Sequence, residues 1–348
     1  ASNEAAPFQS DGALHTASDE AYWREVAAAY DVMDGVINLE NGNWGLMARP
    51  VLQRYQVHTG TVNRRNSYFA RREYADIYRP IHERLADVLG ADADEIAIPR
   101  GATEALKALI AGYNRLQPGD GVMIADLDYG SIQNAMGWKA AQSGGRLVRL
   151  SVPEPVTHDA LIAFYDAAMV ANPDVRLLLL THVSHRTGLV IPVPEIVAAA
   201  RLRGVDVIVD AAHSWGQMDF DVTALGADFV GFNLHKWIGA PIGVGVMYIK
   251  GDRLEAVSPD MSAELWERDG TGGRVHTGTM NFAAVMSLPD ALDFHDQVGP
   301  ANKAARLAYL RNVWVDQVRP LERIEILTPD DLRMHAGITS FRVAGKTS

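Results

Sequence analysis

The feature that most constrains this sequence is a series of short apolar runs separated by segments of helical length. Residues 121–125, 177–180 and 207–209 are apolar at every position rather than at every second position. An uninterrupted apolar run of this length is typical of a strand that is covered on both faces. Because such strands alternate with helices here, the pattern predicts βαβ units, a mainly parallel sheet and an α/β fold.

The predicted elements follow one another along most of the chain. We predict strands at 95–99, 121–126, 146–151, 175–181, 205–210, 229–232 and 244–250, and helices at 102–113, 131–142, 158–171 and 193–203. A first helix begins at Ser18 or Asp19 and runs to about residue 30. After residue 282, helices at 283–297 and 302–318 and short strands at 323–327 and 337–343 predict a smaller α+β unit.

We therefore predict three parts of the chain. Residues 1–36 form an N-terminal segment that packs on the small domain, residues 37–282 form the large domain, and residues 283–348 form the small C-terminal domain. A chain of 348 residues with 48% hydrophobic residues is long enough to bury the core that this division needs.

Charge and composition limit the classes of partner that this chain is expected to bind. The net charge is −11, and nucleic acids and anionic membranes are bound through basic patches, so we predict neither as a partner. No run approaches the roughly 18 apolar residues of a membrane helix. The sequence has no cysteine, which excludes disulfides and thiolate metal sites within these residues. It begins at Ala1 rather than Met, which favours an exported, processed protein; cytoplasm and periplasm both stay open.

Polar residues follow two of the predicted strands. Strand 205–210 ends in Asp210, with His213 three residues later, and strand 229–232 leads into His235 and Lys236. In an open α/β sheet, ligands bind beyond the carboxyl ends of the strands. We therefore expect Asp210, His213 and Lys236 to surround one cavity.

A third strand leads into Gly101-Ala102-Thr103, a turn of small residues that opens a helix. The free amides and positive end of a helix N-terminus make a phosphate site. A phosphate site, a lysine and a carboxylate are what pyridoxal-5′-phosphate (PLP) requires. Its aldehyde bonds a neutral lysine amine, and its ring nitrogen stays protonated beside an anion.

Five motifs together resemble the class V aminotransferase family, and within it the isopenicillin N epimerase-like branch. They are Asn41-Gly-Asn-Trp-Gly, Gly101-Ala-Thr-Glu, Thr181-His-Val-Ser-His-Arg-Thr-Gly, Asp210-Ala-Ala-His and His235-Lys. The resemblance spans roughly residues 37–281 and follows the family order. It implies an aspartate-aminotransferase-like fold of type I, with a large domain, a smaller α+β domain and PLP as cofactor.

The resemblance also implies roles for the residues that hold the cofactor. Lys236 carries it as a Schiff base and then moves the Cα proton, and Asp210 pairs with the ring nitrogen. His213 and His185 lie near the ring hydroxyl, and Tyr129 stacks on the ring. The phosphate is held by Thr103, by the amides of Gly101 and Ala102, and by the side chains of Asn233 and His235, where Asn233 replaces a serine common in relatives.

The remaining implied roles concern the substrate and a second subunit. Thr279 reaches the phosphate of the neighbouring subunit, which implies a homodimer with a shared active site. The substrate is a small amino-acid-type molecule, with Asn43, Arg71 and Arg72 as candidate contacts. Relatives continue past residue 348 with the carboxylate-binding arginine and, in desulfurases, the persulfide cysteine, so the resemblance implies that the small domain is incomplete here.

Several alternatives stay open. After removal of the Cα proton, the reaction is either an amino transfer, an isopenicillin N epimerase-like epimerisation, an elimination or a decarboxylation. The chain is alternatively a periplasmic enzyme that tailors peptides or siderophores, or a PLP-fold binding protein without turnover. A dinucleotide enzyme is disfavoured because Gly243-Val-Gly245 lies within a strand-like run. We predict no metal, because the histidines at 182, 185, 213 and 235 include no i,i+4 pair on one helix.

Overall fold

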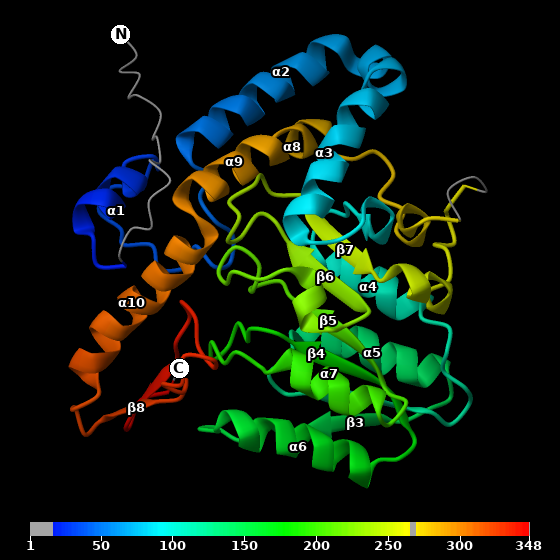
Figure 1. Ribbon diagram of the computed structural model, residues 1–348, viewed down its shortest axis with the longest axis vertical. Coiled ribbons are helices and arrows are strands. Elements are labelled where there is room, and N and C mark those ends of the chain that lie inside the picture. Colours follow the sequence, from blue (N-terminus) through cyan, green and yellow to red (C-terminus); the bar gives the residue numbers. More distant parts are fainter. Residues whose placement is uncertain (1–16, 265–268, 348) are drawn as a thin grey trace.

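A seven-stranded sheet forms the centre of the molecule in the computed structural model, which describes residues 17–264 and 269–347 (Figure 1). The strand order is β1-β7-β6-β5-β4-β2-β3, and only β7 runs against its neighbours. The strands are β1 (Ile96–Ala97), β2 (Gly121–Ala125), β3 (Leu147–Leu150), β4 (Val175–Thr181), β5 (Asp206–Asp210), β6 (Phe229–Asn233) and β7 (Gly245–Ile249). The predicted α/β fold with a mainly parallel sheet is confirmed.

Helices cover both faces of this sheet. They are α4 (Ala102–Gly112) and α5 (Gly130–Gln142) on one face, and α6 (His158–Ala171) and α7 (Val193–Arg201) on the other. Strand β4 shows the consequence, because Leu177 and Leu179 pack with α4 and α5 whereas Leu178 and Leu180 pack with α6 and α7. Burial on both faces explains why the strands are apolar at every position.

The remaining elements lie on two sides of the sheet (Figure 1). The helices are α1 (Glu20–Ala27), α2 (Arg49–Arg72), α3 (Tyr74–Leu89), α8 (Phe282–Met286), α9 (Leu288–Val298) and α10 (Pro300–Val318), and the strands β8 (Ile324–Ile326) and β9 (Phe341–Val343) form a separate antiparallel pair. In Figure 1, α2, α3 and α8 lie above β7, and α1, α10 and β8 lie to the left of the strands. Short 3-10 turns span Ala93–Glu95, Val222–Leu225, Gly251–Ala256 and Thr271–Arg274.

Helix α1 is held by an N-terminal cap and by side-chain contacts with α9 and α10. Asp19 is its cap, as the sequence predicts, and accepts hydrogen bonds from the amides of Ala21 and Tyr22. The Tyr22 hydroxyl donates to the Val298 carbonyl at 3.1 Å, and Arg306 pairs with Glu20 at 2.6 Å. Helix α1 therefore packs against the α9–α10 region, although the three-part division of the chain stays a prediction.

The structure differs from the predicted elements in two places. The stretch between residues 30 and 95, for which we predict no element, contains the long helices α2 and α3. The predicted helix 283–297 is divided at Ser287 into α8 and α9. Pro289 has no amide hydrogen to continue the helical ladder, and the Ser287 hydroxyl instead donates to the Ala283 carbonyl at 2.8 Å.

The parallel strands bring their carboxyl ends to one edge of the sheet. Thr181 at the end of β4 is paired in register with Asp210 at the end of β5, and Asp210 is paired with Gly231 of β6. Helix α4 begins at the same edge. The amide of Gly245, at the start of β7, donates to the Pro99 carbonyl, and the Gly245 backbone lies against that of Gly101. In the described part of the chain, no helix combines the length and the apolar character that crossing a membrane requires.

Candidate active site

A cavity of about 1550 Å³ opens at this edge of the sheet. It exceeds the roughly 300–1,000 Å³ of common ligand pockets, so it has room for more than one small molecule. Of the residues predicted from the sequence, the cavity is lined by Asn43, Gly101, Ala102, Thr103, Tyr129, His185, Asp210, His213, Asn233, His235 and Lys236.

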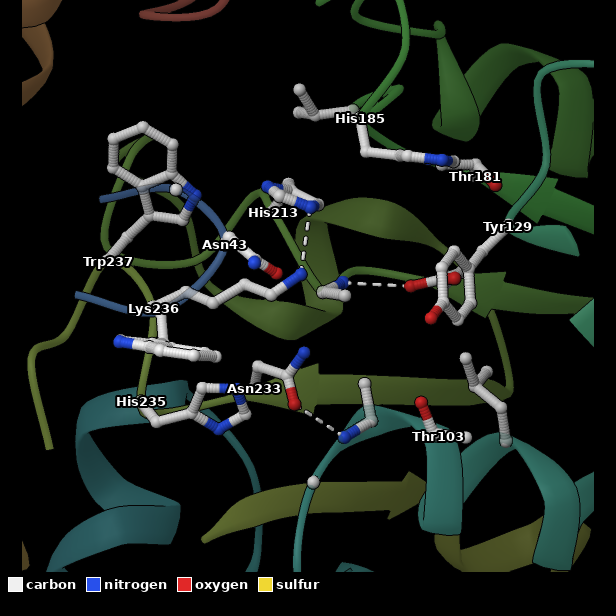
Figure 2. Close-up of a pocket in the computed structure, with 18 of the residues that line it drawn as sticks. Asn43, Thr103, Tyr129, Thr181, His185, His213, Asn233, His235, Lys236 and Trp237 are labelled. Carbon is white, nitrogen blue, oxygen red and sulfur yellow. Dashed lines mark hydrogen bonds between the residues drawn. The ribbon is translucent and has the colours of Figure 1, made fainter. Parts of the chain in front are cut away.

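The Lys236 side chain points into this cavity from the loop after β6 (Figure 2). Its Nζ lies 2.8 Å from Nε2 of His213. Burial lowers the pKa of Lys236 to about 8, although the charge of Asp210 opposes the shift. Burial and the positive charge of Lys236 together lower the pKa of His213 to about 3, so this imidazole is neutral and accepts a hydrogen bond from the amine.

The backbone on both sides of Lys236 is held by distant segments. The Gly45 amide donates to the His235 carbonyl at 2.7 Å, and Lys303 of α10 donates to the Trp237 carbonyl. A Cβ on Gly45 would clash with the Lys236 carbonyl oxygen, so only glycine fits there. The Asn41–Gly45 motif therefore fixes the path of the Lys236 loop.

Asp210 ends β5 with its carboxyl group at the cavity wall and is only 4% exposed. One carboxyl oxygen accepts a hydrogen bond from the Ala212 amide at 3.0 Å. Burial raises the pKa of Asp210, and the nearby charge of Lys236 opposes this rise. A buried carboxylate in this position favours a cation in the cavity.

Three aromatic side chains stand on one wall of the cavity. The ring of Tyr129 meets the ring of His185 edge-on, with centroids 5.4 Å apart, and His185 lies parallel to His213 at 6.3 Å. Tyr129 is the N-cap of α5 and is 45% exposed, so its ring is accessible from the cavity. Burial also lowers the pKa of His185, which favours its neutral form.

The turn before α4 forms the opposite wall (Figure 2). Thr103 is exposed there, and a Cβ on Gly101 would lie 2.8 Å from Oδ1 of Asn233. The amide of Ala102 donates to this same Oδ1 at 2.8 Å. Asn233 thus occupies one of the amides that we predict for phosphate binding, and its own amide nitrogen remains as a donor.

Three of the predicted residues do not line this cavity. Arg71 and Thr279 line a second hollow of about 700 Å³ between the end of α2 and the segment before α8. Arg72 lines neither hollow. All three are exposed. The structure does not bring these three side chains to the cavity of their own chain, and their roles stay predictions.

Sequence reasoning missed Thr181 and Arg100, which line the cavity, and Asp128, which lies buried behind Thr181. Thr181 lines the cavity at the end of β4, and its hydroxyl donates to Oδ1 of Asp128 at 2.7 Å. Asp128 is fully buried. Thr181 ends the predicted strand 175–181 and Asp128 follows the predicted strand 121–126, so the signal that identifies Asp210 is present at both. Arg100 also lines the cavity, with its guanidinium 2.6 Å from Glu104.

The residues present fit PLP. Helix α4 begins at the cavity wall after Gly101, and a helix N-terminus favours a phosphate. The lowered pKa of Lys236 favours the neutral amine that an aldehyde requires, and the buried Asp210 supplies the anion. Within residues 17–264 and 269–347, no three His, Asp or Glu side chains converge on a point that could hold a metal ion.

A mainly parallel sheet with a buried lysine and a carboxylate at its carboxyl edge defines the class of PLP-dependent proteins of fold type I. The sequence model of the class-V aminotransferase family matches residues 48–348. The chain therefore belongs to the class-V aminotransferase family, as the sequence motifs predict. PLP is the cofactor of this family, so the predicted cofactor is confirmed.

Individual relatives include enzymes with different reactions. Isopenicillin N epimerase of Streptomyces clavuligerus is 28% identical over 93% of this chain and 85% of its own length. A probable cysteine desulfurase of Vibrio cholerae is 29% identical over 78% of this chain and 69% of its own. The solved structure of the Escherichia coli cysteine desulfurase CsdA superposes with a TM-score of 0.77 at 24% identity, covering 92% of this chain and 82% of that one. This last likeness shows the fold alone.

Proposed function

We propose that the chain is a PLP-dependent enzyme that acts on an amino acid or an amino-acid-derived metabolite, by aminotransferase or isopenicillin N epimerase-like chemistry. The observation that carries the proposal is the position of Lys236. Its amine lies in the cavity, 2.8 Å from a neutral His213, and burial lowers its pKa to about 8. When bound, PLP supplies an electron sink that makes the substrate Cα–H bond acidic.

Lys236 is the residue that bonds the cofactor aldehyde and, once released, moves the Cα proton. A base for this proton must be neutral near the working pH, and the lowered pKa favours that form. His213 accepts a hydrogen bond from the amine and so orients it. Asp210 lines the same cavity and supplies the anion for the ring nitrogen.

The phosphate would be held at the start of α4. Thr103 offers its hydroxyl, and Asn233 offers the amide nitrogen that the bond to Ala102 leaves free. The positive end of α4 favours an anion at the same place. His235 lines this side of the cavity and is a further candidate donor.

Two features support a substrate larger than a free amino acid. The cavity of about 1550 Å³ exceeds common ligand pockets. Its lining includes the aromatic side chains of Trp44, Trp314 and Phe341, which are suited to an apolar substituent. An amino-acid side chain of a larger metabolite fits both features.

We further propose a homodimer. Arg71 and Thr279 line the second hollow and do not line the Lys236 cavity of their own chain. In the proposed dimer these residues face the neighbour's cavity, Thr279 toward the phosphate and Arg71 toward the substrate carboxylate. Sedimentation analysis tests the dimer, and a monomer at all concentrations would contradict it.

The function is tested by spectroscopy and product analysis. We expect the purified protein to gain a visible absorption band with PLP, and Lys236→Ala to lose it. Lys107→Ala is the matched control, because Lys107 lines the same cavity on the exposed side of α4. A panel of amino acids and peptides, followed by chiral product analysis, then distinguishes amino transfer from epimerisation. Spectral shifts without any product would instead support a binding protein.

A further inference from the structure

A second buried carboxyl group lies behind Asp210. Asp128 follows β2, is 0% exposed, and accepts two hydrogen bonds of 2.7 Å, from the Ala125 amide and from the Thr181 hydroxyl. Two donors aimed at its two oxygens suit the ionised form. These two donors offset part of the effect of burial, which favours the neutral form of Asp128.

Thr181 connects this carboxyl group to the cofactor site. It ends β4 directly opposite Asp210 in the β4–β5 pair, and its side chain lines the cavity. Burial raises the pKa of Asp128, and the negative charge of Asp210 adds to this rise, which shows that the two groups are electrostatically coupled. Asp128 therefore lies within electrostatic reach of the Asp210 carboxyl group.

Asp128 is surrounded by groups that do not neutralise it. The charge that acts on Asp128 is that of Asp210, and the charge of Asp128 in turn helps raise the pKa of the buried Tyr165 hydroxyl. Burial is the main reason that the pKa of Asp128 is raised to about 7. A buried carboxylate without a cation is unfavourable, and such groups concentrate at functional sites.

We propose that Asp128 is a positioning residue of the cofactor site, a second carboxylate that acts through Thr181 and Asp210 to stabilise the protonated ring nitrogen of PLP. The inference rests on the proposed function, because it needs the ring nitrogen beside Asp210. A cation there is attracted by both carboxylates, and across a few ångströms of protein interior the added attraction is large enough to measure.

Asp128→Asn is the variant that removes charge and preserves shape. The asparagine oxygen can accept from the Ala125 amide, and its nitrogen can donate to the Thr181 hydroxyl, which is both donor and acceptor. Asp126→Asn is the matched control. Asp126 lies two residues earlier, is exposed, and bonds Ser151 and Val152 rather than the cavity wall.

The experiment is a binding titration of the cofactor-free full chain at pH 8, with PLP and with an analogue that has a ring carbon in place of the nitrogen. We expect Asp128→Asn to raise the Kd for PLP about tenfold and to leave the Kd for the analogue unchanged. Asp126→Asn should bind both as the wild type does. An unchanged Kd for PLP, or equal losses for both ligands, would overturn the inference.

Thr181 provides a second, independent variant. Thr181→Val removes the donor to Asp128 and should weaken PLP but not the analogue, whereas Thr181→Ser keeps the hydroxyl and should restore PLP binding. Equal binding by the valine and serine variants would overturn the link through Thr181. A wild-type chain that binds no PLP would contradict the proposed function itself, whereas PLP bound equally by wild type and Asp128→Asn contradicts only the inference.

Discussion

Lys236 Nζ and His213 Nε2 lie 2.8 Å apart, and the two residues come from loops that follow neighbouring strands of the sheet. His213 follows β5 and Lys236 follows β6. The contact joins a lysine with a lowered pKa to a neutral imidazole, so His213 adds no positive charge beside the amine. This arrangement prepares the amine to react with an aldehyde.

The pKa of Lys236 predicts how PLP capture depends on pH. Only the neutral amine attacks the aldehyde, so the capture rate should rise with pH and level off above about 8. In Asp210→Asn the midpoint should move to lower pH, because the charge of Asp210 favours the ammonium form. Stopped-flow absorbance measures both midpoints. A wild-type midpoint near the ordinary lysine value of 10.5 would contradict the account.

Asp210→Asn should bind PLP more weakly than Asp128→Asn does, and at saturating PLP it should lose Cα chemistry. An amide does not hold the ring nitrogen in its charged form, and a charged hydrogen bond contributes roughly 1.5–3 kcal/mol, so we expect deuterium exchange at the substrate Cα to slow by about 100-fold. The exchange is followed by NMR in heavy water. Asp219→Asn, at an exposed carboxylate, serves as control. Exchange at the wild-type rate in Asp210→Asn would be incompatible with the assigned role.

Asn233 should tolerate serine better than aspartate. Serine keeps a small polar group beside the Ala102 amide, whereas aspartate replaces the amide nitrogen by a second oxygen that repels the phosphate. We expect the Kd for PLP to change by less than about threefold in Asn233→Ser and to rise at least about tenfold in Asn233→Asp. If both variants bind PLP equally well, the phosphate is held elsewhere.

Asp128→Asn should stabilise the cofactor-free protein at alkaline pH. Because the pKa of Asp128 is raised from 3.8 to about 7, the folded chain binds this proton more tightly than the unfolded chain. Stability is therefore lost as pH rises from about 4 to 7 and stays lower above 7. The asparagine removes this loss, so its melting temperature at pH 8 should exceed that of the wild type.

The difference in melting temperature should shrink toward pH 4, where the wild-type carboxyl group is protonated. Differential scanning calorimetry at pH 8 and pH 4 measures both values, with Asp126→Asn as control. A variant that is less stable than the wild type at pH 8 would show that the buried charge does not weaken the fold.

The parallel strands and the site residues that follow them could be predicted from the sequence. Apolar runs identify buried strands, and the carboxyl edge of a parallel sheet brings Asp210 and Lys236 together whatever their distance along the chain. The predicted helix 158–171 agrees with α6 at both ends, where Thr157 caps the helix and Pro173 follows it.

Other features depend on contacts that no local pattern shows. Helix α2 buries only Val51 and Phe69, so its apolar spacing is sparse. Helix α3 buries residues at helical spacing, at positions 74, 81, 85 and 89, so its local pattern does indicate a helix. Asn233 bonds Ala102 across 131 positions, which the motif at Gly101 does not reveal. Asp128 looks like an ordinary turn residue in the sequence, and only its complete burial beside Thr181 distinguishes it.

The central claim is that Lys236 bonds the cofactor, and reductive trapping tests it most directly. The protein is incubated with PLP, reduced with borohydride, digested and mapped by mass spectrometry. The account predicts a pyridoxyl-phosphate label on the peptide that contains Lys236, and no label there in Lys236→Ala. A label carried instead by Lys107 or Lys303, or an equal yield of label in Lys236→Ala, would contradict it.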